Sequence, residues 1–326
     1  MPPVQLRLED AGAPDFAPRV IEILNSTLPV NGAKTPGEAA AALDALFGEN
    51  YVEADGAGGF LWWFWDLIHD LSRQVPYNSP EAERLASTLQ ALHDLPTKSV
   101  KLGDSWGAGS TVELWQDLPL FGATYREAID NGNAFSSSQL DFNTHASTVA
   151  DHASLRADPR APNEEERKQR FVNLQTHAAR VAGLGLIKAD TWSSWALWTL
   201  VEALEGSMTP IRGAPDEINE DPAAVEDISY KVKSAAAWII FAGNRLYGRD
   251  EEVVGATAGP LWRLDKKEAV KLKKKTKGTD GYCPERWNLW KQRLARIRDT
   301  DKLEAGVRNE AGYALTAMEV VEKFHT

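Results

Sequence analysis

The chain has 326 residues, one cysteine and a formal net charge of −11 at pH 7. This length allows one large domain or two ordinary ones, and the single Cys283 excludes an intramolecular disulfide framework and multi-cysteine metal centres. The acidic balance argues against non-specific nucleic-acid binding as the main activity. No apolar run approaches the ~20 residues of a membrane-spanning helix, and the first residues resemble no targeting signal. We therefore expect a protein of the cytoplasm or the nucleus.

Apolar side chains recur with the helical period along most of the chain, and no alternating segment bounded by hairpin turns is found. Ser, Thr, Asn or Asp followed by Pro or Glu marks several helix starts. Gly183 and Gly185 mark one helix end. The expected helices cover, in chain order, residues 15–28, 36–48, 58–75, a segment from 80, then 120–131, 164–182, 191–205, 223–247, 284–298 and 302–324.

These segments predict an all-α fold, a single compact array of about ten helices. Its long connections, at 97–115, 206–220 and 247–282, are rich in Gly, Pro or charge. We expect an N-terminal tail at 1–14 and one helical domain at 15–326, with a lysine-rich loop insert at 263–281.

Tryptophan shares a helix face with charged residues in several of these segments. In segment 58–75, one apolar stripe is expected in the core: Phe60, Phe64, Leu67, Leu71 and Val75. The neighbouring stripe combines one tryptophan with ionisable groups: Trp62, Asp66, His69 and Arg73. Later helices repeat this pattern. It favours ordinary helix packing, because indole buries a large apolar area.

The alternative interpretation is an aromatic cavity for an apolar small molecule. Its walls would be Trp62, Trp195, Trp198, Trp238 and Trp287. In that case Asp66 or Glu202 would act as general acid or base, and His69 or Arg286 would stabilise developing charge.

Other clusters carry weaker signals. Asp141, His145, Thr148 and His152 share one helical face, but the histidine spacing of seven favours a solvated helix over a metal site. A second face carries Asn173, His177 and Arg180, and this arrangement favours a satisfied interhelical histidine. Cys283 precedes a helix start. A cysteine without a functional role is favoured at this position over a reactive thiol. We therefore predict no metal site and no cofactor.

The lysine-rich insert forms the one strongly basic patch. Its central residues are Lys271, Lys273, Lys274 and Lys275. Such a patch could contact RNA phosphates or an acidic partner. No aromatic residue interleaves it, so base stacking is not indicated and a solvated loop is favoured.

Several motifs together resemble a known family. The stretches DLPLFGATYREAID, RFVNLQTHAARVAGLGL, WALWTLVEALEG, AAAWIIFAGNRLYG, AGPLW and CPERWNLWKQRLARI occur in this order. They resemble a fungal domain-of-unknown-function family, DUF3632, over about residues 62–322, with AGPLW and PERWNLW as the most specific elements. The resemblance implies a fungal, intracellular, mostly helical protein and supplies no catalytic residues. The insert between Trp262 and Tyr282 is longer than the family pattern, so a shared function there is not expected.

The function remains open between two classes. No nucleophile, metal or phosphate-binding motif occurs, which favours a binding or regulatory module with a protein or small-molecule partner. The alternative is a cofactor-independent enzyme of fungal secondary metabolism, such as a cyclase, isomerase or dehydratase. RNA or tRNA binding through the insert is the weakest alternative. The sequence leaves the oligomeric state undetermined.

Overall fold

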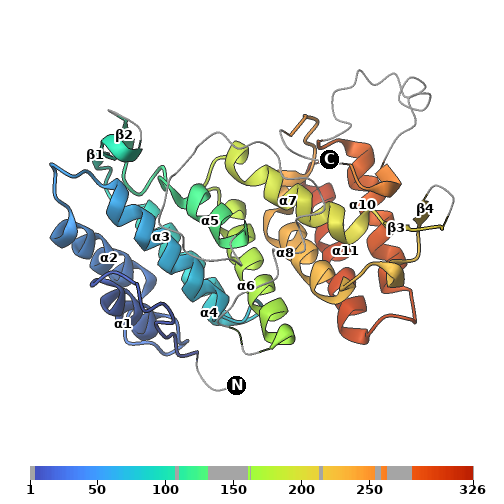
Figure 1. Ribbon diagram of the computed structural model, residues 1–326, viewed down its shortest axis with the longest axis horizontal. Coiled ribbons are helices and arrows are strands. Elements are labelled where there is room, and N and C mark those ends of the chain that lie inside the picture. The colour runs from blue at the N-terminus through green and yellow to red at the C-terminus, as the bar shows by residue number, and fades with distance from the viewer. Residues whose placement is uncertain are drawn as a thin grey trace. The chain divides into compact units, whose positions relative to one another are not determined.

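The computed structural model describes residues 4–106, 110–130, 161, 163–212, 216–253, 258–262 and 281–325. Ten α-helices and two small antiparallel sheets make up this part of the chain (Figure 1). The prediction of an all-α fold with about ten helices is confirmed. Two units separate at the residue pair 187/188. Each is described by itself, and the prediction of one single domain stays a prediction.

The first unit holds six helices and the sheet β1–β2. Its elements are α1 (Ala17–Thr27), α2 (Pro36–Asn50), α3 (Gly58–Arg73), α4 (Pro80–His93), β1 (Ser99–Lys101), the 3-10 helix η1 (Asp104–Trp106), β2 (Thr111–Glu113), α5 (Phe121–Asp130) and α6 (Glu164–Gly183). Three helix starts follow their predicted caps, because the side chains of Thr35, Ser79 and Asn163 accept hydrogen bonds from backbone N–H groups of the first turn.

The core of the first unit lies around α3. This helix packs against α5 and α6, and α4 packs against α2 and α6 (Figure 1). The five apolar residues predicted for the core stripe of segment 58–75 are all buried, and four of them lie on α3. Trp65 and Trp115 are fully buried in the same core, with Trp65 Nε1 donating to the Pro119 carbonyl at 2.8 Å. Trp115 Nε1 donates to Asp44 Oδ1 at 2.8 Å, so both indole N–H groups have an acceptor within the first unit.

The second unit holds four helices and the sheet β3–β4. Its elements are α7 (Ala189–Leu204), β3 (Ser207–Thr209), β4 (Glu217–Asn219), the 3-10 helix η3 (Pro222–Ala224), α8 (Ile228–Leu246), the 3-10 helix η4 (Pro260–Trp262), α10 (Pro284–Arg298) and α11 (Ala305–His325). Helix α8 packs against both α7 and α11, and α10 packs against α11 and α7. The indole rings of Trp192 and Trp238 stack in the core with centroids 5.9 Å apart.

Two expected features differ from the structure. The helix expected over 223–247 is divided into η3 and α8, because Val225 is extended and Asp227 has φ of +57°. The loops at 97–115 and 206–220 contain the small sheets, whose strands of three residues are too short to show alternation. In the described part of the chain, no helix combines the length and apolar character needed to cross a bilayer.

Candidate functional site

A fully buried ion pair lies at the centre of the second unit. Glu205 follows the end of α7, and Arg286 belongs to the first turn of α10; both side chains are 0% exposed. The guanidinium donates through Nε to Glu205 Oε1 at 2.6 Å and through Nη2 to Oε2 at 3.0 Å. This two-pronged geometry is the strongest arrangement available to an arginine and a carboxylate.

Two further donors complete the coordination of the Glu205 carboxylate. Trp290, one turn after Arg286, donates its indole N–H to Oε1 at 2.8 Å, and the backbone N–H of Gly259 donates to Oε2 at 2.7 Å. A Cβ on Gly259 would clash with the Glu205 side chain, so only glycine permits this approach. We call these four residues the Glu205 cluster.

The remaining groups of Arg286 are also engaged. Its Nη1 donates to the Gly281 carbonyl at 2.7 Å, and its guanidinium lies 5.7 Å from the ring centroids of Trp262 and Trp290. Each carboxylate oxygen of Glu205 thus accepts two hydrogen bonds, and each nitrogen of the Arg286 guanidinium donates one, all within the protein. Such a cluster holds the 258–262 segment against Glu205 at the end of α7 and against α10.

The predicted aromatic residues of the second unit lie mostly in its core. Trp195, Trp238 and Trp287 are buried, whereas Trp198 and Glu202 are half-buried on α7. The indole of Trp287 donates to Glu322 at 3.0 Å. The core interpretation thus suits three of the four tryptophans. The role of Arg286 in stabilising charge during catalysis stays a prediction, and the sequence analysis did not identify its partner, Glu205.

In the first unit, Trp62 lies against a second tryptophan. The rings of Trp62 and Trp106 have centroids 5.3 Å apart, and both side chains are half-buried. Gly58 makes room for Trp106, because a Cβ at this position would overlap the indole. Asp66, one turn after Trp62, is half-buried. The sequence did not reveal the Trp62–Trp106 pair, since the two residues come from different elements.

His69 lies deep in the first unit and faces α5. It is 0% exposed, and its Nε2 lies 3.3 Å from the Phe121 carbonyl and 3.2 Å from the Thr124 hydroxyl. Its ring centroid is 6.0 Å from that of His177 on α6. Burial lowers the pKa of His69 well below its usual range, and the nearby His177 and Arg73 lower it further.

His177 is likewise held in its neutral form. Burial, with a smaller effect of Arg180, lowers its pKa to about 3. Asn173, one turn earlier on α6, accepts from the Tyr77 N–H at 2.9 Å and donates to the Arg73 carbonyl at 2.7 Å. The Asn173 face of α6 therefore packs against the segment that follows α3. Among the described residues, the Nδ1 of His69 and the Nε2 of His177 have no hydrogen-bond partner, so the expected satisfied histidine is not found at His177.

The four predicted catalytic residues belong to different units. Asp66 and His69 lie on α3, whereas Glu202 and Arg286 lie in the second unit. Their joint action in catalysis, at one cavity lined by Trp62 and the other tryptophans, stays a prediction. Cys283 is buried at the cap position of α10.

Two predicted clusters lie outside the described residues. They are the face of Asp141, His145, Thr148 and His152 and the lysines Lys271, Lys273, Lys274 and Lys275. Among the residues that the structure does describe, no group of three or more His, Cys, Asp or Glu side chains could hold a metal ion.

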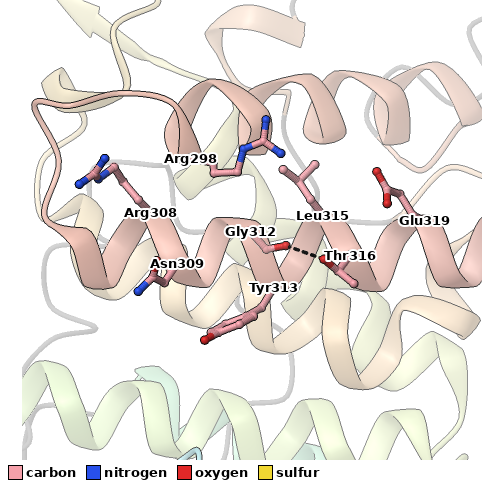
Figure 2. A pocket seen from close by; sticks show the side chains of 8 residues that line it. All are labelled: Arg298, Arg308, Asn309, Gly312, Tyr313, Leu315, Thr316 and Glu319. Atoms are coloured by element: carbon pink, nitrogen blue, oxygen red, sulfur yellow. Dashed lines mark hydrogen bonds between the residues drawn. The ribbon is translucent and has the colours of Figure 1, made fainter.

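A groove of about 370 Å³ runs along α11 beside the end of α10 (Figure 2). Arg298 comes from α10, and the other lining residues come from α11: Arg308, Asn309, Gly312, Tyr313, Leu315, Thr316 and Glu319. Figure 2 shows Leu315 and Glu319 pointing to the α10 side, and Asn309 and Tyr313 pointing to the other. Because Gly312 has no side chain, the stem of Arg298 can lie above it, 3.8 Å from the position of a Cβ.

The outer face of α11, which we call the α11 face, carries large exposed apolar side chains. Tyr313 is 62% exposed, Val320 45% and Phe324 84%. Their spacings of seven and four place them on one side of the helix, opposite the buried side that contains Ala311, Ala314 and Met318. Exposed apolar residues that form a stripe beside a groove are typical of a protein contact.

Comparison with known proteins identifies one family. The family model described as "Protein of unknown function (DUF3632)" matches residues 65–294. Curated proteins and solved structures give no match to the chain.

Proposed function

This chain belongs to the DUF3632 family of proteins of unknown function, and from its geometry we propose that it is a non-catalytic binding module. The α11 face contacts a protein partner. The observation that carries the proposal is the apolar stripe of Tyr313, Val320 and Phe324, which is exposed at helical spacing beside the groove. When one helix docks into the groove of another protein, the residues that make contact recur at intervals of three, four and seven. The residues of this stripe have such intervals.

The internal chemistry of the second unit supports a binding function over an enzymatic one. Glu205 and Arg286 are fully buried, and they bond to each other and to groups of the same chain. A general acid or base needs a site that substrate can reach. The enzyme alternative, with Asp66 and Glu202 as proton-transfer groups, predicts that Asp66→Asn or Glu202→Gln abolishes an activity of the purified protein.

We also propose an intracellular location, in the cytoplasm or the nucleus. The support is the single cysteine, a free thiol that is buried in the structure. A fungal role in secondary metabolism, a small-molecule ligand and RNA contact through the lysines are secondary proposals that rest on the sequence alone.

Quantitative affinity capture tests the binding proposal. The tagged full chain serves as bait beside two variants. One carries Tyr313→Ser, Val320→Ser and Phe324→Ser; the matched control carries Val30→Ser and Val52→Ser, which are exposed apolar positions of the first unit. Each bait is mixed with an extract of cells that express this protein, and the extract also contains a differently tagged copy of the chain.

We expect at least one protein to bind the wild type and the control, and to be lost with the α11 variant. Once purified, this partner protein should bind the α11 variant at least about tenfold more weakly than it binds the wild type. Equal capture by all three baits, or no capture by any of them, would overturn the proposal.

A further inference from the structure

We propose that the first unit carries a peptide-binding site, which the chain's own residues 4–10 occupy in this structure. In trans, the site takes an extended segment of a partner protein that has a leucine and, three residues later, a carboxylate. The inference goes beyond the proposed function, since it uses no residue of the α11 face. It follows from the way in which Asn25, Gln74 and Arg170, which we call the peptide site, hold residues 4–10.

Asn25 and Gln74 bind the backbone of two consecutive residues. Asn25, on α1, accepts from the N–H of Leu6 at 2.8 Å and donates to its carbonyl at 3.0 Å. Gln74, at the end of α3, accepts from the N–H of Arg7 and donates to its carbonyl, both at 2.9 Å. In an extended chain, the N–H and C=O of successive residues point to opposite sides. The two amide groups therefore hold the segment from both sides, as two neighbouring strands would.

The attachment of the segment relies on side chains of the first unit. Among the described residues, no backbone–backbone hydrogen bond joins residues 4–9 to another element. An exposed turn at Ala11 and Gly12 follows the segment. A separate peptide can make the same contacts, because the amide groups and the guanidinium need no covalent link between the segment and α1.

Two side chains of the segment make the contacts that select a sequence. Leu6 is buried, at 2% exposed, whereas Leu8 is 41% exposed. Glu9 accepts a two-pronged contact from Arg170 on α6, with Nη1 2.7 Å from Oε2 and Nη2 3.0 Å from Oε1. The Nε of Arg170 donates to Glu166 at 3.1 Å, which orients the guanidinium toward the segment. The peptide site thus selects a leucine and a carboxylate three residues later.

This combination of contacts is typical of the recognition of extended peptides. Hydrogen bonds to the peptide backbone supply affinity, and contacts to individual side chains supply specificity. Residues 4–10 are tethered to α1 by a short linker, so they compete for the site at an effective concentration of about 1 mM. A partner segment must bind the site more tightly than residues 4–10 do, and this competition excludes weak ligands.

Fluorescence anisotropy of a labelled peptide tests this inference with the full chain. The peptide has the sequence of residues 4–12, VQLRLEDAG. A variant that we call the opened chain carries Leu6→Ser and Glu9→Ser, so that its own segment competes poorly. The peptide should bind the opened chain at least about tenfold more tightly than it binds the wild type, whose segment still occupies the site.

Matched changes in the peptide test which side chains are selected. Leu6→Ser in the peptide removes the buried apolar contact and should weaken binding to the opened chain by at least about tenfold. Leu8→Ser removes the leucine that is 41% exposed in the structure. It is the matched control, and this peptide should bind as tightly as the unchanged one.

A charge reversal tests the contact to Arg170. Arg170→Glu, added to the opened chain, opposes the carboxylate of Glu9 in the peptide and should weaken binding by at least about tenfold. A peptide with Glu9→Arg restores opposite charges and should bind this variant more tightly than the unchanged peptide does. Lys101→Glu, at an exposed position of β1, is the control for the change in net charge.

Hydrogen exchange in the wild-type chain supplies a readout that needs no substitution. An excess of isotopically labelled peptide should displace residues 4–10 and raise their exchange, while helix α1 keeps its protection. If the opened chain fails to fold, this measurement decides alone, and unchanged exchange at residues 4–10 overturns the inference.

A folded opened chain that does not bind the peptide overturns the inference. Binding that tolerates both Leu6→Ser in the peptide and Arg170→Glu in the chain also overturns it. If sedimentation velocity shows a wild-type dimer that excess peptide dissociates, the occupant is a second copy of the chain and its assignment to a different protein is wrong. These failures differ from failure of the proposed function, since capture through the α11 face does not involve the peptide site.

Discussion

Removing the Glu205 carboxylate tests the account of the second unit most directly. Glu205→Ala leaves three buried donor groups without their acceptor: the guanidinium of Arg286, the indole N–H of Trp290 and the backbone N–H of Gly259. Breaking one partner of a buried ion pair costs about 3–5 kcal/mol, because the remaining charge stays desolvated. Glu205→Gln keeps the volume but presents an NH₂ group to donors, and should cost at least about 2 kcal/mol.

A double-mutant cycle separates the pair from its surroundings. Glu205→Leu strands the Arg286 guanidinium in the interior and Arg286→Met strands the Glu205 carboxylate, whereas the combination of these two substitutions removes both charges. The double variant should be more stable than the sum of the two singles predicts, by about 2–3 kcal/mol. It should remain less stable than the wild type, since Trp290 and Gly259 still lack their acceptor.

Urea denaturation followed by tryptophan fluorescence gives these unfolding free energies. Hydrogen exchange with mass spectrometry assigns the loss to a region, and peptides from α7, α10 and the 258–262 segment should lose protection first. Glu217→Gln, at an exposed position of β4, is the control and should change stability by less than about 0.5 kcal/mol. If the changes in unfolding free energy of the two single variants simply add in the double variant, residues 205 and 286 are not coupled and the reasoning is refuted.

Three further predictions concern buried contacts. His69 and His177 have pKa values below those of the unfolded chain, so their contribution to stability is fully present above about pH 6.5. The contribution of His177 should decline as the pH falls toward 3, by roughly 1 kcal/mol per pH unit, and His177→Leu should remove that part of the slope in urea unfolding at stepwise pH. Gly58→Ala should displace Trp106, seen as a changed emission spectrum against a Gly59→Ala control. Gly259→Ala should lower the melting temperature by several degrees through its clash with the Glu205 side chain.

The sequence predicted those parts of the fold that depend on local contacts. Pro36, Pro80 and Pro284 begin their helices as expected, because a fixed φ and a missing N–H suit the first helical position. Helix α11 begins at Ala305, three residues after the expected start at Lys302, since a turn over Thr300 to Leu303 precedes it. End positions of this kind depend on turns that helical periodicity does not encode.

The candidate site was less predictable, because its contacts join distant parts of the chain. Glu205 and Arg286 are 81 residues apart. The helical spacing of α7 drew attention to Glu202, which shares a face with two tryptophans, while Glu205 lies just beyond the end of the helix. Similarly, His69 was placed on a polar face of α3, and the structure shows that α5 and α6 cover this face. Which side of a helix becomes buried depends on the neighbouring elements, which the periodicity of one segment does not determine.

Two motifs that carry the family resemblance and the surface proposed for binding lie in different parts of the second unit. AGPLW contributes Gly259 and PERWNLW contributes Arg286 and Trp290, and all three bind the Glu205 carboxylate. These motifs therefore stabilise the fold. The α11 face belongs to Ala305–His325, beyond the matched residues 65–294. A shared fold does not fix a shared partner, so the sequence of α11 can change between family members without disturbing the Glu205 cluster.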